Sequence, residues 1–304
     1  MTEHYDTVIV GAGPAGLSAA IMLGRCRRRV LLCDGGGQRN LASLAVHGLL
    51  GHEGLSPAQL LAKGRRELEK YPTVVIHDVE VRSITKEGDV FRVVCADSGV
   101  AQAAKVLLAT GIVDDVPKIE GIDGLYGRSV HHCPYCDGFE HRDQPIAVYG
   151  AADKGAGLAC MMKLWSSDVI LCTDGGAAPG AEAKARLADL GVAVHTEPIA
   201  RLEGTSNGEL RRIVFRSGAS LGRTALFFTT GCSQRSSLWQ ELGCARDEKN
   251  GIITDPLTEE SSVPGVYVAG DISRDVLLVS VAAAEGAKAG VAINRALLKR
   301  DGLA

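Results

Sequence analysis

The sequence lacks the features of a membrane protein and of a nucleic-acid-binding protein. No apolar run reaches the ~18 to 20 residues that a helix needs to span a bilayer. Residues 1–6 lead into a predicted strand without the charged leader, apolar segment and cleavage site of a signal peptide. The formal net charge is only -3, so no overall field would attract nucleic acid or an anionic membrane. We therefore expect a cytoplasmic protein that binds neither nucleic acid nor membrane.

Aromatic residues are also scarce, at 4 % of the chain, whereas glycine is abundant, with 37 residues. Apolar residues make up 46 % and charged residues 23 %. This balance is typical of a soluble α/β protein, in which glycines form tight turns between strands and helices. The 304 residues exceed the usual size of one domain, so we expect two domains of roughly 100 to 200 residues.

Nine cysteines, an odd number, are scattered along the chain. Most lie within apolar strand or helix patterns, as Cys33, Cys95 and Cys172 do, and there a thiol behaves as a small hydrophobic side chain. In a reducing cytoplasm such thiols need no partners. Only Cys133 and Cys136, separated by two residues, have the spacing for redox chemistry.

The N-terminal segment has the order of a dinucleotide-binding unit. An apolar strand at 7–10 precedes the glycine turn 11–16, and a helix of small residues follows at about 17–23. A second apolar strand at 30–33 ends in Asp34, which lies at the distance where such sites carry an acid for the ribose.

Each glycine of this turn has its own task in a dinucleotide site. Gly11 permits the tight turn, Gly13 lets a pyrophosphate approach the backbone, and Gly16 lets helix and strand pack closely. The helix N-terminus supplies free N–H groups for the phosphates. We therefore predict that Asp34 accepts hydrogen bonds from an adenosine ribose.

Later segments repeat this pattern and predict the domain organisation. A strand at 146–149 precedes the turn 150–155, and the strand at 225–228 with its glycine turn resembles the segment 106–111. The strand before Gly270 is followed by a long helix, predicted from about Val276 to Leu298. If that strand returns to the first sheet, the second nucleotide fold is an insertion. The predicted domains are therefore 1–117 with 236–304, and 118–235.

The segment His131-His132-Cys133-Pro134-Tyr135-Cys136-Asp137 carries the predicted redox centre. Two cysteines at this spacing can form a short disulfide, and a nearby histidine or a helix start stabilises a thiolate. His131, His132 and Asp137 are the local groups that can move protons. The alternative is half of a zinc site in which His131 or His132 joins the two sulfurs. It is disfavoured because structural zinc usually recruits a second Cys or His pair, whereas the other cysteines lie mostly in apolar elements.

These motifs resemble those of the low-molecular-weight thioredoxin reductase group of flavoproteins. The matching marks are the glycine turn 11–16, Asp34, the Ala-Thr-Gly turn 109–111, the Cys-x-x-Cys-Asp-Gly segment 133–138 and the Gly-Asp pair 270–271. Their order and spacing span nearly the whole chain. The resemblance implies an α/β fold with two Rossmann-like nucleotide-binding domains, the second inserted into the first, and a homodimer.

By this resemblance FAD lies in the domain 1–117 with 236–304. Cys136 would lie next to the flavin, Cys133 would exchange with substrate, and Asp137 would donate or accept a proton. His132 is a candidate base from the local chemistry of the segment. Asp271 would lie near the ribityl chain. The residues that the resemblance assigns to FAD are Gly11, Gly13, Pro14, Ala15, Gly16, Asp34, Gln38, Asn40, Val81, Ala109, Thr110, Gly111, Gly270 and Asp271.

The second glycine turn departs from the family pattern. It has Ala152 where the glycine that admits the pyrophosphate should stand. After the next strand, Thr173, Asp174 and Gly175 occupy the positions where the family places arginines for the 2′-phosphate of NADPH. NADPH is therefore a poor candidate for the electron donor. NADH stays open, because Asp174 could accept a hydrogen bond from its ribose hydroxyl.

A branch of the family shows this kind of loss: the dithiol oxidases that close disulfides in gliotoxin-, holomycin- and depsipeptide-type natural products. They keep FAD and the Cys-x-x-Cys and pass electrons to dioxygen. The segments 132–140 and 268–275 resemble this branch more than the thioredoxin-specific one. A substrate pocket would involve loops, such as 40–47. Trp165 and Trp239 are better explained as core or surface residues.

The implied mechanism is oxidative. A substrate thiolate attacks Cys133, and the second substrate thiol resolves the mixed disulfide. Cys136 thiolate then adds to the flavin, and dioxygen reoxidises FAD to give hydrogen peroxide. One alternative is a disulfide reductase that serves a thioredoxin-like protein and uses NADH, NADPH or a protein electron donor. The other, a non-catalytic flavin-binding module, is disfavoured because it has no need of the two cysteines.

Overall fold

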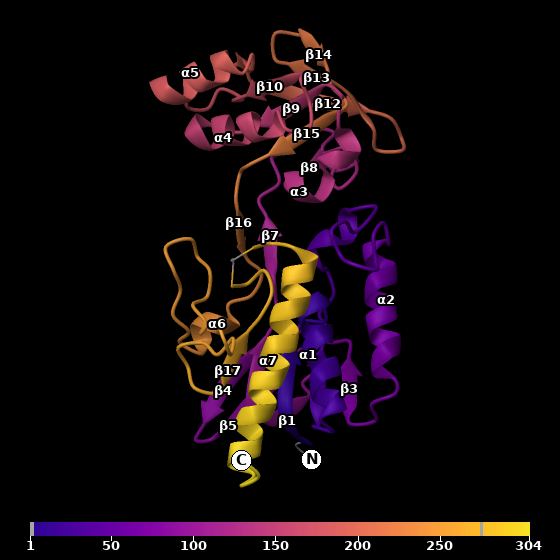
Figure 1. Cartoon of the computed structure of the whole chain (residues 1–304), viewed down its shortest axis with the longest axis vertical. Coiled ribbons are helices and arrows are strands. Elements are labelled where there is room, and N and C mark those ends of the chain that lie inside the picture. The colour runs from indigo at the N-terminus through magenta and orange to yellow at the C-terminus, as the bar shows by residue number, and fades with distance from the viewer. Residues whose placement is uncertain (1–2, 274–275) are drawn as a thin grey trace. The chain divides into compact units, whose positions relative to one another are not determined.

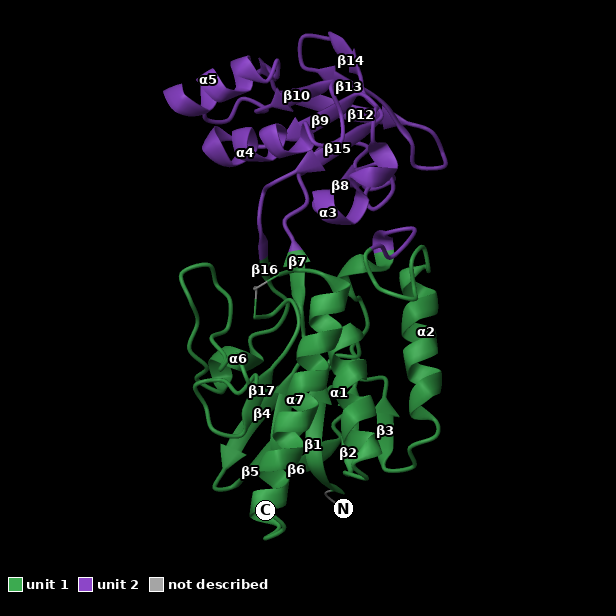
Figure 2. Cartoon of the chain, in the orientation of Figure 1, with its two compact units in different colours: residues 1–41, 48–113, 233–304 green, residues 42–47, 114–232 purple. Residues whose placement is uncertain are grey.

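The computed structural model describes residues 3–273 and 276–304. Arg274 and Asp275, at the end of the segment 268–275 that resembles the dithiol oxidases, lie outside the described residues, as do residues 1–2. The chain forms two compact units (Figure 2). The first unit comprises 1–41, 48–113 and 233–304, and the second comprises 42–47 and 114–232.

The main unit boundaries lie a few residues from the predicted 117 and 236. The assignment of residues 42–47 to the second unit was not predicted. This segment joins the second unit through a close backbone contact. Gly127 lies so near Ala42 that a Cβ at Gly127 would be 2.3 Å from the Ala42 carbonyl oxygen. Such a long-range contact leaves no trace in local sequence patterns.

The first unit is built on a mixed sheet in the order β3-β2-β1-β6-β5-β4, with β17 pairing in parallel with β6 (Figure 1). The strand before Gly270 thus returns to the first sheet. Its elements are β1 (Glu3–Val10), α1 (Pro14–Arg25), β2 (Val30–Cys33), η1 (Arg39–Ala42), α2 (Pro57–Leu68), β3 (Val74–His77), β4 (Val81–Glu87), β5 (Val90–Cys95), β6 (Val100–Leu108), α6 (Leu238–Glu241), β17 (Val266–Val268) and α7 (Val279–Arg300).

The sheet of the first unit is buried on both faces, which explains the continuous apolar runs of its central strands. Along β1, Val8 and Val10 pack in one core cluster, whereas Ile9 packs in the other. Helices α1 and α7 lie side by side (Figure 1). Their backbones approach so closely that a Cβ at Gly286 would lie 2.0 Å from the Ala15 carbonyl oxygen. Small residues are therefore required where these helices meet.

The second unit has a parallel sheet in the order β11-β10-β9-β15-β8 and an antiparallel sheet β12-β13-β14. The segments that connect the units, β7 (Ile112–Asp114) and β16 (Cys232–Gln234), pair with each other. The elements of the second unit are β8 (Val130–His131), α3 (Pro134–Asp137), η2 (Phe139–His141), β9 (Ile146–Tyr149), α4 (Ala152–Met162), β10 (Val169–Cys172), α5 (Ala181–Asp189), β11 (Ala193–His195), β12 (Ile199–Gly204), β13 (Leu210–Phe215), β14 (Ser220–Gly222) and β15 (Ala225–Phe228).

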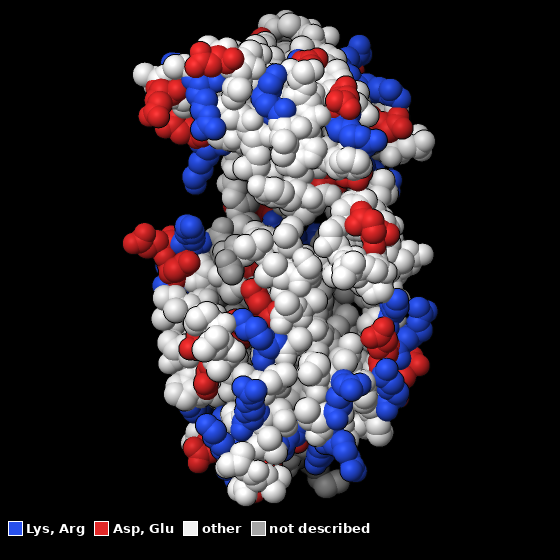
Figure 3. All heavy atoms as spheres, in the orientation of Figure 1, with Lys and Arg blue, Asp and Glu red and all other residues white. Residues whose placement is uncertain are grey.

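The visible surface carries acidic and basic side chains that are interspersed rather than gathered by sign (Figure 3). This distribution agrees with the small net charge of -3. Within the described ranges 3–273 and 276–304, no helix is both long and apolar enough to cross a membrane.

Candidate functional site

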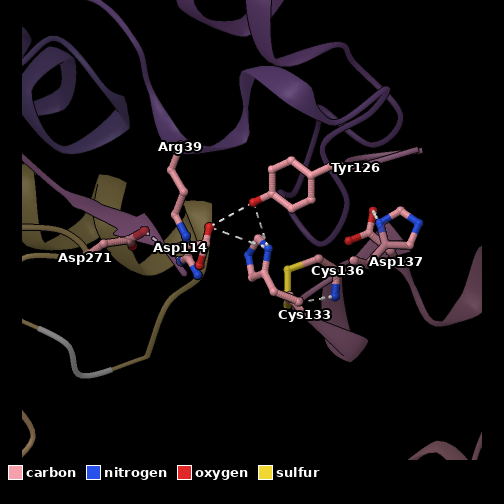
Figure 4. The surroundings of a disulfide bond; sticks show 9 residues. Arg39, Asp114, Tyr126, Cys133, Cys136, Asp137 and Asp271 are labelled. Carbon is pink, nitrogen blue, oxygen red and sulfur yellow. Dashed lines mark hydrogen bonds and ion pairs between the residues drawn. A yellow bond between two sulfur atoms is a disulfide. The ribbon is translucent and has the colours of Figure 1, made fainter. Parts of the chain in front are cut away.

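Cys133 and Cys136 are joined by a disulfide, with their Cα atoms 5.3 Å apart (Figure 4). Cys133 is the N-cap of the short helix α3, which begins at Pro134. The backbone N–H of Cys136 donates to Cys133 Sγ at 3.1 Å. This donor would stabilise negative charge on Cys133 when the disulfide opens.

His132 lies in a cluster with Asp114 and Tyr126, from the same unit as the disulfide. Its Nδ1 lies 3.6 Å from Asp114 Oδ2 and 3.4 Å from the Tyr126 hydroxyl, which donates to Asp114 Oδ2 at 3.0 Å (Figure 4). The Asp114 side chain is only 4 % exposed. A buried carboxylate of this kind orients an imidazole and stabilises its protonated form.

His131 belongs to a different cluster, because consecutive residues of a strand point to opposite faces. Its Nδ1 lies 3.3 Å from Asp137 Oδ1, and its Nε2 lies 2.9 Å from His141 Nε2. The His131 side chain is 4 % exposed and packs on Phe227. Burial, and then the neighbouring His131, lower the pKa of His141 to about 4.

Two of the predicted proton-handling residues, His132 and Asp137, are thus separated into two clusters beside the disulfide. The sequence did not identify Asp114, Tyr126 or His141 as their partners. Asp114 follows a predicted glycine turn, where an acid is expected as an ordinary loop residue. No spacing signal links it to His132, since the contact depends on how β7 and β8 are placed.

Of the two tryptophans, Trp239 lies in the core of the first unit. Trp165 packs edge-on against Tyr135 of α3, with ring centroids 6.0 Å apart. A Cβ at Gly138 would lie 3.0 Å from the Trp165 ring. Trp165 therefore supports the short helix that carries the disulfide.

The first glycine turn has the geometry of an open phosphate site. Gly11 has a φ of 106°, and a Cβ there would lie 2.3 Å from the Ala109 carbonyl oxygen, so the 109–111 turn lies directly against it. A Cβ at Gly16 would lie 1.8 Å from the Gly11 carbonyl oxygen. At Gly13, by contrast, a Cβ would have no described heavy atom within 4 Å. No side chain caps the N-terminus of α1 there.

Asp34 lies at the end of β2, where it accepts hydrogen bonds from Gly36 N at 3.0 Å and Gln38 Nε2 at 2.9 Å. It also pairs with Arg65 of α2, which contacts Asp78 at 2.6 Å. Arg65 was not predicted, because an arginine in the middle of an amphipathic helix resembles an ordinary exposed residue.

Of the remaining predicted cofactor residues, Gly270 lies against the start of α1. Gly270 has a φ of 83°, and a Cβ there would lie 3.1 Å from Ala15 Cβ. Asp271 pairs with Arg39 of η1, the helix that also contains Asn40, at 3.0 Å (Figure 4). The Val81 side chain is buried in the core, and its backbone pairs with Cys95 of β5.

These residues fit a bound FAD. Gly13 provides open space, the N-terminus of α1 provides N–H groups, and Asp34 provides a carboxylate. The buried Thr110 hydroxyl has no hydrogen-bond partner within the described residues, as expected where a polar ligand completes the site.

The second glycine turn is closed by the chain itself. The N–H of Ala152 donates to the Ala177 carbonyl oxygen at 2.7 Å. The carboxylate of Asp153, in the first turn of α4, accepts from Gly180 N at 2.8 Å. Ala152 also has a φ of 50°, a conformation that glycine adopts without cost. A backbone donor and the helix start that would bind a pyrophosphate are therefore engaged by the 173–180 loop.

Asp174, the expected acceptor for the ribose of NADH, also accepts hydrogen bonds from the protein. It accepts from the Tyr149 hydroxyl at 2.9 Å and from Ile199 N at 2.6 Å. Burial and this hydrogen bond raise the pKa of Tyr149 to about 12. Both Asp174 oxygens thus have protein donors, as both oxygens of Asp34 do, so this carboxylate by itself does not distinguish the two sites.

Comparisons with known proteins agree with this architecture. A family model described as pyridine nucleotide-disulphide oxidoreductase matches residues 5–286. A curated relative named probable thioredoxin reductase, from Arthroderma benhamiae, is 31% identical over 304 residues, covering 90% of this chain and 75% of the relative.

Two crystal structures resemble the whole chain. The putative thioredoxin reductase TrxB from Bacillus anthracis has a TM-score of 0.92 at 30% identity, covering 98% of this chain and 99% of that one. The structure of HlmI has a TM-score of 0.94 at 32% identity, covering 99% and 96%. The predicted α/β fold with two Rossmann-like domains is thereby confirmed, as is FAD, which proteins of this family bind. The chain belongs to the pyridine nucleotide-disulphide oxidoreductase family and is a thioredoxin reductase-like, FAD-dependent oxidoreductase.

Proposed function

We propose that the enzyme is a dithiol oxidase that forms a disulfide in a small-molecule dithiol and uses dioxygen as electron acceptor. The observation that carries the proposal is the closed second glycine turn. Ala177 occupies a backbone donor of that turn, and Asp153 places a negative charge at the N-terminus of α4, where a pyrophosphate would bind. A reductase needs this site for a nicotinamide donor, whereas an oxidase receives its electrons from the dithiol.

In the proposed reaction, a substrate thiolate attacks Cys133 Sγ, the Cys133–Cys136 bond breaks, and Cys136 leaves as thiolate. The second substrate thiolate then attacks the substrate sulfur of the mixed disulfide, so that Cys133 leaves and the substrate disulfide forms. His132, oriented by Asp114, accepts a proton from the substrate thiol. FAD in the first unit supplies the two-electron chemistry that reoxidises the cysteine pair and reduces dioxygen to hydrogen peroxide.

The test is an anaerobic titration of the flavoprotein with NADPH, NADH and a small dithiol, followed by admission of air. We expect the dithiol alone to bleach the flavin absorbance, and we expect air to restore the colour with one hydrogen peroxide formed per dithiol. Rapid bleaching by NADPH or NADH would contradict the proposal.

A second candidate is a disulfide reductase that acts on a thioredoxin-like protein. It is favoured by the name of the Arthroderma relative, a probable thioredoxin reductase. In this case a nicotinamide or a protein electron donor would reduce the flavin, and the reduced enzyme would reduce thioredoxin faster than dioxygen.

The family resemblance also supports a cytoplasmic homodimer with FAD bound by 1–117 and 236–304 and the disulfide carried by 118–235. Light scattering on the purified flavoprotein distinguishes a dimer from a monomer.

A further inference from the structure

His131, Asp137 and His141 form a partly buried cluster that includes the last residue of α3, the short helix that carries the disulfide. His131 connects the other two, with one ring nitrogen toward Asp137 Oδ1 at 3.3 Å and the other toward His141 Nε2 at 2.9 Å. Two imidazole nitrogens at this separation repel each other unless a proton lies between them. The three side chains thus form a continuous path for a proton.

The neighbours of the cluster are either apolar or paired with other residues, so its charge depends on these three side chains. Asp137 comes from α3 and His141 from η2, while β15 contributes the apolar ring of Phe227, which packs on both imidazoles. Of the charged neighbours on η2 and just after it, Glu140 pairs with His47 at 3.6 Å, and Arg142 lies over the Phe139 ring.

His141 is suited to the end of such a path. Its lowered pKa, about 4, keeps the ring neutral near pH 7, so it can accept a proton through one nitrogen while it carries one on the other. His141 is also less buried than His131, which is 4 % exposed. A proton that reaches His141 is therefore closer to solvent.

We propose that His131 and His141 are positioning residues for Asp137, which follows Cys136 in the chain, and that they relay a proton between its carboxyl group and solvent. The inference rests on the proposed function. When substrate attack releases Cys136 as a thiolate, one proton passes from His141 through His131 and Asp137 to its sulfur. When the disulfide re-forms, the proton returns along the same path. No electrons pass through the relay.

The test is anaerobic stopped-flow reduction of the bound FAD by dithiothreitol, measured as a function of pH. The variants are His141→Gln, Asp137→Asn and the double variant, with His195→Gln as a matched control. His195 is a histidine of the same unit that stacks on Phe215, at 3.9 Å, outside this cluster. His141→Asn provides a second variant, and the visible spectrum of the flavin shows that each protein is folded.

We expect His141→Gln to slow reduction about 10- to 100-fold and to move the inflection of the pH profile. The double variant should be no slower than Asp137→Asn, because both residues act through one group. The control should behave as the wild type.

Wild-type rates and pH profile in both His141 variants, or losses that multiply in the double variant, would overturn the relay alone. A wild-type flavin that dithiothreitol fails to reduce would overturn the proposed function and the relay with it.

Discussion

Along β8 and the residue that follows it, consecutive side chains point to opposite faces, and this alternation separates the two histidines before the disulfide. His132 meets Asp114, and His131 meets Asp137. Each histidine therefore has its own carboxylate. Two separate groups are thus available, one to accept a proton and one to supply it.

The substitution Asp114→Asn tests the first histidine–carboxylate pair. It keeps the shape of the side chain and removes the negative charge that favours protonated His132. We expect the anaerobic reduction of FAD by a small dithiol to slow about tenfold or more at neutral pH. Asp123→Asn, at an exposed position of the same unit, is the control. An Asp114→Asn enzyme as fast as this control would exclude the proposed role.

The lowered pKa of His141 predicts a loss of stability in acid. In the unfolded chain His141 is protonated as the pH falls below its ordinary pKa of about 6.5. In the folded protein it is protonated only near a pH of about 4. The unfolded state therefore binds more protons in this window, and the free energy of unfolding falls as the pH is lowered through it. We expect this histidine to contribute a loss on the order of 3 kcal/mol. Urea unfolding at both pH limits measures it, and His141→Gln should lose correspondingly less than the wild type.

At the scale of elements, the two units contain the same strand, glycine turn and helix but use the turn differently. In the first unit, α1 begins without a side-chain cap beside open space at Gly13. In the second unit, the loop 173–180 donates to and accepts from the start of α4. The difference between the turns supports the proposal that the first site holds FAD and that the second has lost the nicotinamide donor.

Alanine substitutions separate the ligand-binding glycine from the packing glycine. Gly13→Ala meets no described atom within 4 Å, so the apoprotein should keep its melting temperature while its affinity for FAD falls. Gly16→Ala would place a methyl group against the Gly11 carbonyl oxygen and should destabilise the fold by about 1–3 kcal/mol. Thermal unfolding of the apoproteins and titration with FAD measure both effects. A destabilised Gly13→Ala apoprotein that binds FAD normally would reverse this assignment.

At the scale of the whole molecule, the chain leaves its first unit after β6 and returns to it through β16, so that β17 completes the sheet beside β6. The two Rossmann-like folds could be predicted because their apolar strands and glycine turns are local patterns. The segment 42–47 could not, since it depends on the contact between Ala42 and Gly127.

The burial of cysteines across both units predicts which thiols react. Burial raises the pKa of Cys33 strongly and that of Cys172 to about 12, so neither should form thiolate near neutral pH. We expect maleimide to label the exposed Cys26 in the oxidised protein, and to label Cys133 and Cys136 only after reduction. Peptide mass spectrometry checks this order. Labelling of Cys33 without denaturant would show that the core is open.

The sequence by itself determined the fold class, the first glycine turn and the position of the cysteine pair. These follow from local spacing, because tight turns need glycine and a short disulfide needs nearby cysteines. The tertiary structure decided which groups surround the pair, joining His132 to Asp114 and linking His131 to Asp137 and His141. The tertiary structure also decided that the second turn is closed. The loop after β10 brings Ala177 and Gly180 to Ala152 and Asp153. Contacts between residues that are distant in sequence carry no local signature, so only the folded chain reveals them.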